Sequence, residues 1–207
     1  KQALIDKMGV EKEKIVVVPN GVNLTRFAGE VERRYPKNEF VVGFTGLLTK
    51  WNRLSLLLQA VARLKQEGLV ISLVFVGDGD GKAAIVTEVK ELGISDRVRF
   101  EGRVSPSDVA TYIKSFDLGY CNPLHASTSS DFSGCPMKIF EYMAAGCNLL
   151  VSRLEIIQSI GIDDDIAFIF EGGDLTSLTN TLRYAYNERS SFARRSAALE
   201  EVSSHHS

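Results

Sequence analysis

Residues 40–79, FVVGFTGLLTKWNRLSLLLQAVARLKQEGLVISLVFVGDG, decide the fold class of this chain. The runs 40–44 and 70–76 are short, rich in β-branched and aromatic residues, and apolar almost throughout, as strands buried on two faces of a sheet must be. Between them, leucine and valine recur at the spacing of one helical face, which predicts a helix over 54–66. A strand, a helix and a strand in this order indicate a βαβ unit.

The same alternation continues along the rest of the chain. Further strands are expected at 98–100, 118–121, 148–151 and 166–170. Together these elements predict a doubly wound, mostly parallel sheet of the Rossmann-like α/β class.

Capping residues mark three more helices. Ser105, Pro106 and Asp108 suit the N-cap, N1 and N3 positions of a helix that runs to about Phe116. A shorter helix is expected between Pro136 at N1 and Gly146 at C′, and another from Asp174 to about Glu188.

Residues 1–27 lack this alternation. A polar helix is followed by a single strand at 15–19, IVVVP, and by a turn at 20–23. We predict that this segment is a linker to another domain and that residues 28–207 form the sheet domain. The chain begins at Lys1 and ends in SSHHS without completing a structural element, so both ends are expected to be truncated.

The composition argues against several classes of protein. The chain has 207 residues, 44% hydrophobic and 24% charged, and a net charge of -2 from interspersed acids and bases, which gives no attraction to nucleic acid or anionic lipid. Its longest apolar runs, such as 69–76, are far shorter than the ~20 residues that span a bilayer. Cys121, Cys135 and Cys147 are odd in number and lack CxxC spacing, which favours reduced thiols in a cytoplasmic protein.

Glycines follow the predicted strands at the edge where open α/β sheets bind ligands. They are Gly46, Gly77, Gly79 and Gly102, and Gly134 precedes the helix that begins near residue 136. A glycine turn lets backbone approach a ligand closely, and a helix N-terminus attracts an anion, so a phosphate-bearing ligand fits. Turn geometry alone explains each glycine equally well, and neither GxGxxG nor a P-loop is present.

Glu141 is the candidate acidic ligand. It lies after Pro136 by five residues, about 7.5 Å along a helix axis at ~1.5 Å per residue. A carboxylate there can accept hydrogen bonds from the ribose of a nucleotide whose phosphate sits at the helix N-terminus. Because Ile139, Phe140 and Met143 form the apolar face, a solvated Glu141 is the equally good alternative.

Five motifs in order resemble a known family. They are VVVPNGVNLTRF, VGFTGLL, LVFVGDG, VRFEGRVS and SGCPMKIFEYMAAG, and the resemblance covers about Val16 to Ser207. The chain resembles the carboxyl-terminal half of retaining glycosyltransferases of family 4, which have the two-domain GT-B fold. This resemblance implies a donor domain that binds a nucleotide diphosphate sugar, UDP- or GDP-linked, with no metal or other cofactor.

The resemblance also implies the rest of the enzyme. The missing amino-terminal domain would hold a glycan or lipid-linked acceptor across a cleft, and residues 1–27 would be its last helix and the hinge. The whole protein would be a cytoplasmic hexosyltransferase of cell-envelope polysaccharide synthesis, at most peripheral on the inner face of the membrane. The chain by itself is expected to transfer nothing, because donor and acceptor cannot be oriented without the second domain.

By position, the resemblance assigns a part of the donor to each candidate residue. Backbone at Gly102, Arg103 and Val104 would meet the base, and Glu141 would bind the ribose. The turn from Gly77 to Gly79 would lie close to the nucleoside. The groups that would face the diphosphate and the sugar are Gly46, Gly134, Cys135, Pro136, Met137 and Lys138.

Three positions depart from the family pattern. Ser133 stands where many members have the first Glu of an E-x7-E pair, which leaves recognition of the sugar unassigned. Leu47 and Asn52 stand where an Arg and a Lys clamp the diphosphate. The candidate replacements are Lys50, Arg53 and Lys138. Lys138 is preferred because a cation in the first turn of a helix is otherwise unfavourable, although a solvated lysine is the alternative.

Other candidates and functions remain open from the sequence. His125 is a candidate acid or base, Asp131 a candidate replacement acid and Trp51 a candidate lid, although a surface histidine and a packing tryptophan are the commoner roles. The same fold would also suit a nucleotide-sugar-binding module without transfer activity, or a sugar-nucleotide epimerase.

Overall fold

The computed structural model describes residues 2–16, 20–122 and 136–189 of the chain. Within these ranges, strands lie at β1 Phe40–Thr45, β2 Ile71–Val76, β3 Val98–Gly102, β4 Leu118–Cys121, β5 Asn148–Arg153 and β6 Ala167–Glu171. The α-helices are α1 Gln2–Met8, α2 Leu54–Gln66, α3 Lys82–Glu91, α4 Pro106–Lys114, α5 Met137–Ala144, α6 Glu155–Ser159 and α7 Leu175–Asn187. Short 3-10 helices lie at η1 Lys12–Lys14, η2 Leu24–Phe27, η3 Lys50–Asn52 and η4 Ser95–Arg97.

The strands form one parallel sheet in the order β3-β2-β1-β4-β5-β6. This order confirms the predicted doubly wound, Rossmann-like α/β class. The direction of winding reverses between β1 and β4, which pair at Val42 with Leu118 and at Gly43 with Gly119. Ligands of such folds bind in the crevice beyond the carboxyl ends of the strands at this switch point.

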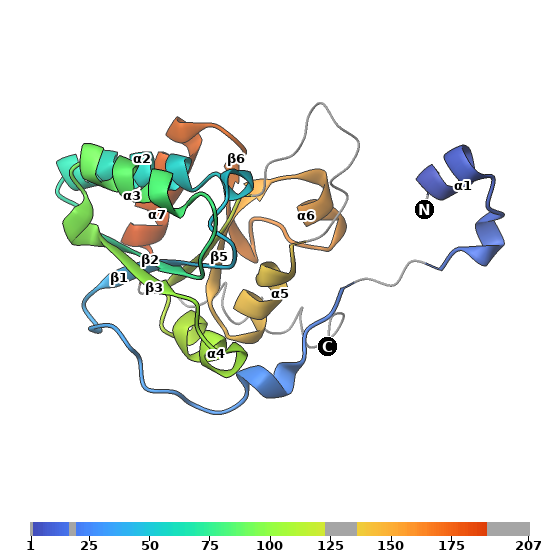
Figure 1. Cartoon of the computed structure of the whole chain (residues 1–207), viewed down its shortest axis with the longest axis horizontal. Coiled ribbons are helices and arrows are strands. Elements are labelled where there is room, and N and C mark those ends of the chain that lie inside the picture. Colours follow the sequence, from blue (N-terminus) through green and yellow to red (C-terminus); the bar gives the residue numbers. More distant parts are fainter. Residues whose placement is uncertain (1, 17–19, 123–135, 190–207) are drawn as a thin grey trace.

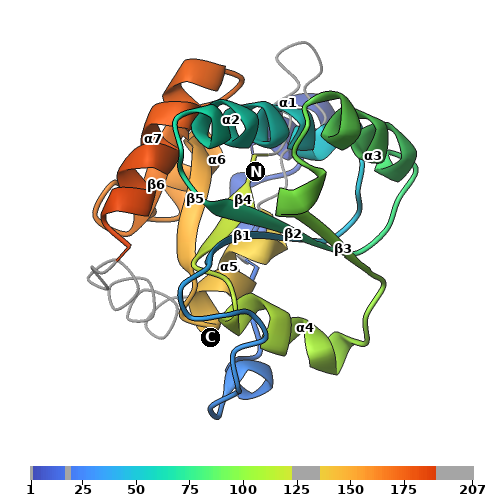
Figure 2. The same cartoon turned by 90° about the vertical axis from the view of Figure 1, so that its left-hand side faces the viewer.

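Helices cover both faces of the sheet (Figures 1 and 2). The helices α2, α3 and α7 pack on one face, around a core that includes Phe44, Phe75 and Leu58. The helices α4 and α5 pack on the other, around a core that includes Phe116 and Tyr142. β1 is buried along its whole length because it contributes side chains to both cores.

Most predicted elements are confirmed, with differences at their ends. The helix over 54–66 has the predicted bounds, and Ser105 caps α4 as expected, its Oγ accepting the Asp108 amide at 3.2 Å. Each strand predicted from residue 40 onward is found within one or two residues of its expected ends. Pro136 was expected at N1 but is the N-cap, because its ψ of 113° is extended rather than helical.

Other elements were missed or fall outside the described residues. The helix α3 was not predicted because only Ile85 and Val89 are buried on it, too few to give a clear periodic stripe. α6 has five residues, too short for such a pattern. In the expected strand 15–19, Ile15 and Val16 lie in no strand, and residues 17–19 are outside the described ranges.

Two glycines let the aromatic core of the α4 and α5 face meet the sheet. A Cβ on Gly43 in β1 would lie 2.1 Å from the Phe116 ring, and one on Gly119 in β4 would lie 2.3 Å from the Tyr142 ring. Both rings therefore rest directly on strand backbone at the switch point.

We predict that Gly43→Ala lowers the free energy of unfolding by about 1–3 kcal/mol, because Phe116 is fully buried and cannot move aside. Gly172→Ala is the matched control, since its Cβ would meet only the Ser152 Cβ at an ordinary 3.5 Å. Urea unfolding of both variants measures the difference. Equal stabilities would contradict the packing described for Phe116.

Candidate functional site

The turns that follow β1, β2 and β3 are bonded to one another through backbone. The Gly46 amide donates to the Val76 carbonyl at 2.9 Å, and the Gly77 amide donates to the Gly102 carbonyl at 2.7 Å. All three glycines have positive φ, 126° at Gly46, 131° at Gly77 and 70° at Gly102. A Cβ on Gly77 would lie 2.0 Å from the Gly46 carbonyl oxygen. The structure thus brings these predicted site glycines together at one edge.

Two further backbone hydrogen bonds join the turns after β1 and β2. The Leu48 amide donates to the Asp78 carbonyl at 3.0 Å, and the Gly81 amide donates to the Leu48 carbonyl at 2.8 Å. A Cβ on Gly79 would lie 2.5 Å from the Leu48 oxygen. Turn geometry therefore requires Gly77 and Gly79, whatever ligand lies above them.

Lys138 extends from the first turn of α5 to the turn after β1. Its Nζ donates to Asn52 Oδ1 at 3.0 Å and lies 4.0 Å from the centroid of the Phe44 ring. A Cβ on Gly46 would lie 3.8 Å from this nitrogen. Burial lowers the pKa of Lys138, and the neighbouring Glu141 opposes this shift. A partly buried ammonium thus lies at the switch point of the sheet, beside a glycine turn.

Asn52 stands where the family pattern has a cation, and its side chain has a different role. Its Nδ2 donates to the Leu47 carbonyl at 2.8 Å, while its Oδ1 accepts the bond from Lys138. Asn52 therefore closes the loop after β1 and fixes the ammonium beside it. The side chains of Leu47 and Trp51 project from the same loop and are exposed.

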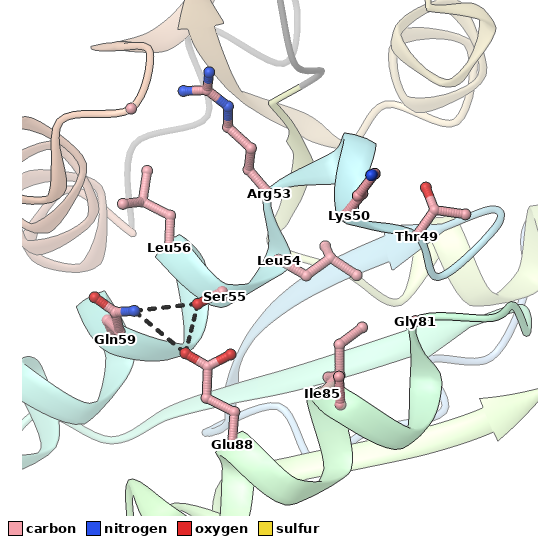
Figure 3. A pocket seen from close by; sticks show the side chains of 12 residues that line it. Thr49, Lys50, Arg53, Leu54, Ser55, Leu56, Gln59, Gly81, Ile85 and Glu88 are labelled. Atoms are coloured by element: carbon pink, nitrogen blue, oxygen red, sulfur yellow. Dashed lines mark hydrogen bonds between the residues drawn. The ribbon is translucent and has the colours of Figure 1, made fainter.

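The other two candidate cations, Lys50 and Arg53, line a pocket of about 430 Å³ between α2 and α3 (Figure 3). This pocket lies on the other face of the sheet from α5. In it, Ser55 Oγ donates to Glu88 Oε1 at 2.5 Å, and Gln59 Nε2 donates to both. These three side chains are thus bonded to one another across the pocket. Of the three cations, Lys138 is the one beside Gly46.

Glu141 lies one turn further along α5 than Lys138. Its side chain is 23% exposed, and its Oε1 is 4.0 Å from Arg26 Nη1. Burial raises the pKa of Glu141, whereas the charges of Arg26 and Lys138 lower it. No hydrogen bond from the described residues reaches this carboxylate. Glu141 is therefore half-buried, with capacity to accept hydrogen bonds, and its role as a ligand stays a prediction.

Arg26 is the neighbour of Glu141 that the sequence did not indicate. It belongs to η2, within the segment predicted to be a linker, and nothing in the chain order relates it to α5. Its Nη2 also donates to the Pro106 carbonyl at the start of α4, at 3.0 Å.

The remaining predicted site residues divide into two groups. Arg103 is exposed, Val104 packs against the second core, and Met137 is exposed at the start of α5. The other candidates lie outside the described ranges, namely His125, Asp131, Gly134 and Cys135, and so does Ser133, which departs from the family pattern.

The described ranges hold neither a metal-binding cluster nor a membrane-spanning helix. In residues 2–16, 20–122 and 136–189, no group of three or more His, Cys, Asp or Glu side chains is arranged to hold a metal ion. That donor activation needs no metal stays a prediction. In the same ranges, no helix combines the length and the apolar character needed to cross a membrane.

The fold and this site define a doubly wound α/β domain, a class whose members bind ligands at a topological switch point. Residues 30–201 match the family model described as Glycosyl transferases group 1. The chain belongs to this family.

Curated relatives are similar over most of this chain but only part of their own. The putative colanic acid biosynthesis glycosyltransferase WcaL of Escherichia coli K12 is 25% identical over 86% of this chain and 43% of its own length. The Escherichia coli UDP-Gal:alpha-D-GlcNAc-diphosphoundecaprenol alpha-1,3-galactosyltransferase is 24% identical over 88% and 48%. The chain thus spans less than half the length of these relatives.

Solved structures share the fold at lower identity. Sucrose-phosphate synthase of Thermosynechococcus elongatus superposes with a TM-score of 0.82, at 19% identity, over 99% of this chain and 52% of its own. Anabaena HepE in complex with UDP-glucose gives 0.77, at 18% identity, over 99% and 57%. The C-terminal domain of the group 1 glycosyl transferase LpcC from Francisella tularensis gives 0.71, at 16% identity, over 88% and 97%. These neighbours are GT-B glycosyltransferases, in agreement with the expected fold.

The burial of Lys138 predicts a pH-dependent stability. Its pKa is lowered in the folded state, so on raising the pH the folded chain releases this proton while the unfolded chain keeps it. The Lys138 contribution to the free energy of unfolding therefore rises with pH, from the lowered pKa up to the ordinary value of 10.5.

We expect Lys138→Met to lose this rise, whereas Lys37→Met, at an exposed lysine, keeps it. Urea unfolding from about pH 7 to about pH 10 measures the slopes. Identical slopes for wild type and Lys138→Met would show that the ammonium is not buried as described.

Proposed function

We propose that this chain is the donor-binding, carboxyl-terminal domain of a metal-independent retaining glycosyltransferase of family 4. The whole enzyme would transfer a hexose from a UDP- or GDP-sugar to a glycan or lipid-linked acceptor held by an amino-terminal domain. One observation carries the proposal: a partly buried Lys138 lies beside the Gly46 turn at the switch point, and a half-buried Glu141 lies one turn further along α5.

The comparisons support the two-domain form of the proposal. The curated relatives are about twice as long as the matched segment, and the LpcC neighbour, which this chain covers almost completely, is a C-terminal domain. The names of the relatives refer to colanic acid and to a diphosphoundecaprenol acceptor, which favours envelope polysaccharide synthesis at the inner face of the membrane.

In this proposal the diphosphate lies against the Gly46 turn and the N-terminus of α5. A phosphate oxygen takes the place of Asn52 Oδ1 as acceptor for Lys138 Nζ. An anion at this position stabilises the charged form of Lys138, which burial disfavours. A charge-assisted hydrogen bond to phosphate is also shorter and stronger than the bond to a neutral amide.

The chemistry required of the domain is departure of the nucleotide diphosphate. Breaking the bond between the anomeric carbon and the phosphate oxygen leaves negative charge on that oxygen. Lys138 and the N–H groups in the first turn of α5 are fixed before the reaction, so they stabilise this charge without reorganising. We assign no protein nucleophile.

The nucleoside half of the donor would lie further along α5. The Glu141 carboxylate accepts two hydrogen bonds from the ribose diol, and backbone at Gly102, Arg103 and Val104 faces the base. Binding of the ribose hydroxyls is the usual role of an acidic residue in nucleotide sites.

Nucleotide binding is the first test. Titration with UDP, GDP and ADP should raise the stability of the chain, by ~2.7 kcal/mol at a ligand concentration of ~100 times Kd. Thermal unfolding at increasing ligand concentration measures this. No shift with any of the three nucleotides would refute the proposed donor site.

Two substitutions should separate the halves of the ligand. We expect Lys138→Met to weaken UDP and pyrophosphate binding by about tenfold to a hundredfold, since a hydrogen bond to a charged group contributes ~1.5–3 kcal/mol. Glu141→Gln should weaken UDP by about tenfold and leave pyrophosphate unchanged, because only UDP carries the diol. Isothermal titration measures both.

The matched control is Lys37→Met, an exposed lysine away from α5 that should bind both ligands like the wild type. Equal losses for UDP and pyrophosphate in Glu141→Gln would contradict the assignment of Glu141 to the ribose.

A further inference from the structure

The segment that precedes the sheet domain is fixed against it beside Glu141. The Asn23 side chain caps η2 by accepting the Thr25 amide at 3.0 Å. Val22 and Phe27 on either side are buried in the core of the α4 and α5 face. Arg26 therefore projects from a backbone that is held in place at both ends.

The Arg26 guanidinium bridges the two helices that flank the proposed nucleoside position. One nitrogen donates to the Pro106 carbonyl at 3.0 Å, where the turn after β3 enters α4. Another lies 4.0 Å from Glu141 Oε1 on α5. The turn proposed to face the base and the carboxylate proposed to bind the ribose are thus connected through one side chain.

The distance to Glu141 suits a supporting role. At 4.0 Å the cation favours the charged carboxylate without occupying it in a direct hydrogen bond. Both carboxylate oxygens consequently remain free to accept hydrogen bonds from two neighbouring hydroxyl groups. A ribose diol presents two such hydroxyls. Without a nearby cation, a half-buried carboxylate would bind them less well, because burial favours its neutral form.

We propose that Arg26 is a positioning residue of the nucleotide site, which holds Glu141 charged and oriented for the ribose diol. This inference rests on the proposed function and deepens it. Its consequence is that residues 20–27, expected to be a linker, belong to the donor site. Nucleotide binding therefore depends on how this segment is seated on α4 and α5.

A pH profile distinguishes this role from a purely structural one. The charged groups that act on Glu141 are Arg26 from η2 and Lys138 from α5 itself. Both lower its pKa, so removing Arg26 raises it. Since the diol binds the charged carboxylate, the loss of affinity on acidification should begin at a higher pH in Arg26→Ala.

The test compares UDP with 2′,3′-dideoxy-UDP, which lacks the diol, by isothermal titration of the 207-residue chain. The diphosphate titrates alike in both ligands, so the ratio of their dissociation constants isolates the diol. We expect Arg26→Ala to weaken UDP by about twofold to fivefold, the range for a partly exposed ion pair, and to leave dideoxy-UDP unchanged. On acidification, the preference for UDP over dideoxy-UDP should be lost at a higher pH in Arg26→Ala than in the wild type. Arg26→Lys should lose it at an intermediate pH.

Lys114→Ala is the matched control. Lys114 Nζ donates to the Gly29 carbonyl and so also joins this segment to α4, but it does not touch Glu141. It should leave the UDP to dideoxy-UDP ratio as in the wild type.

Each outcome decides between the two proposals. If wild type binds UDP in preference to dideoxy-UDP and Arg26→Ala keeps the same preference and pH profile, Arg26 does not position Glu141, although the donor site stands. Equal losses for both ligands in Arg26→Ala and Lys114→Ala would reduce Arg26 to general support of the segment and overturn the inference. No binding of UDP by the wild type would overturn both proposals.

Discussion

The close approach of three turns at the carboxyl edge of the sheet is the constraint on which the site depends. The Gly46, Gly77 and Gly102 turns share backbone hydrogen bonds, and a Cβ on Gly77 would lie 2.0 Å from a carbonyl oxygen. A side chain is therefore excluded at Gly77, and the positive φ disfavours one at Gly46 and Gly102. What remains there is backbone, which gives a ligand close access at the switch point and leaves charge to be supplied from elsewhere.

That charge comes from α5. A cation in the first turn of a helix is opposed by the helix dipole, and burial adds a further cost. Lys138 is nevertheless held there by the Asn52 amide oxygen and the Phe44 ring, which are weaker partners than a phosphate. The domain thus keeps one ammonium fixed beside the glycine turns, in the absence of the cations expected at positions 47 and 52. Glu141 one turn later gives α5 both charges of the proposed site.

Elements with one dominant local signal were predicted well. α2 carries a full apolar stripe, α4 has its Ser105 cap, and α7 has the Asp174 cap, so the bounds of these helices differ from prediction by two residues at most. α3 was missed because two buried positions make no stripe. Of the candidate site, the glycine turns and the pair on α5 followed from chain order and from the family resemblance. The choice among Lys50, Arg53 and Lys138 did not, since only packing shows that Lys138 reaches the Gly46 turn while the other two line the pocket between α2 and α3.

The sequence by itself determined the class of fold, the edge at which a ligand would bind and the helix that carries Lys138 and Glu141. These follow from periodicity and from turn residues, which act over a few neighbouring positions. Only the tertiary structure decided that Asn52 holds Lys138, that Gly77 has no room for a side chain, and that Arg26 lies against Glu141. Each of these contacts joins residues far apart in the chain, so its energy depends on how whole elements pack and leaves no local trace in the order of residues.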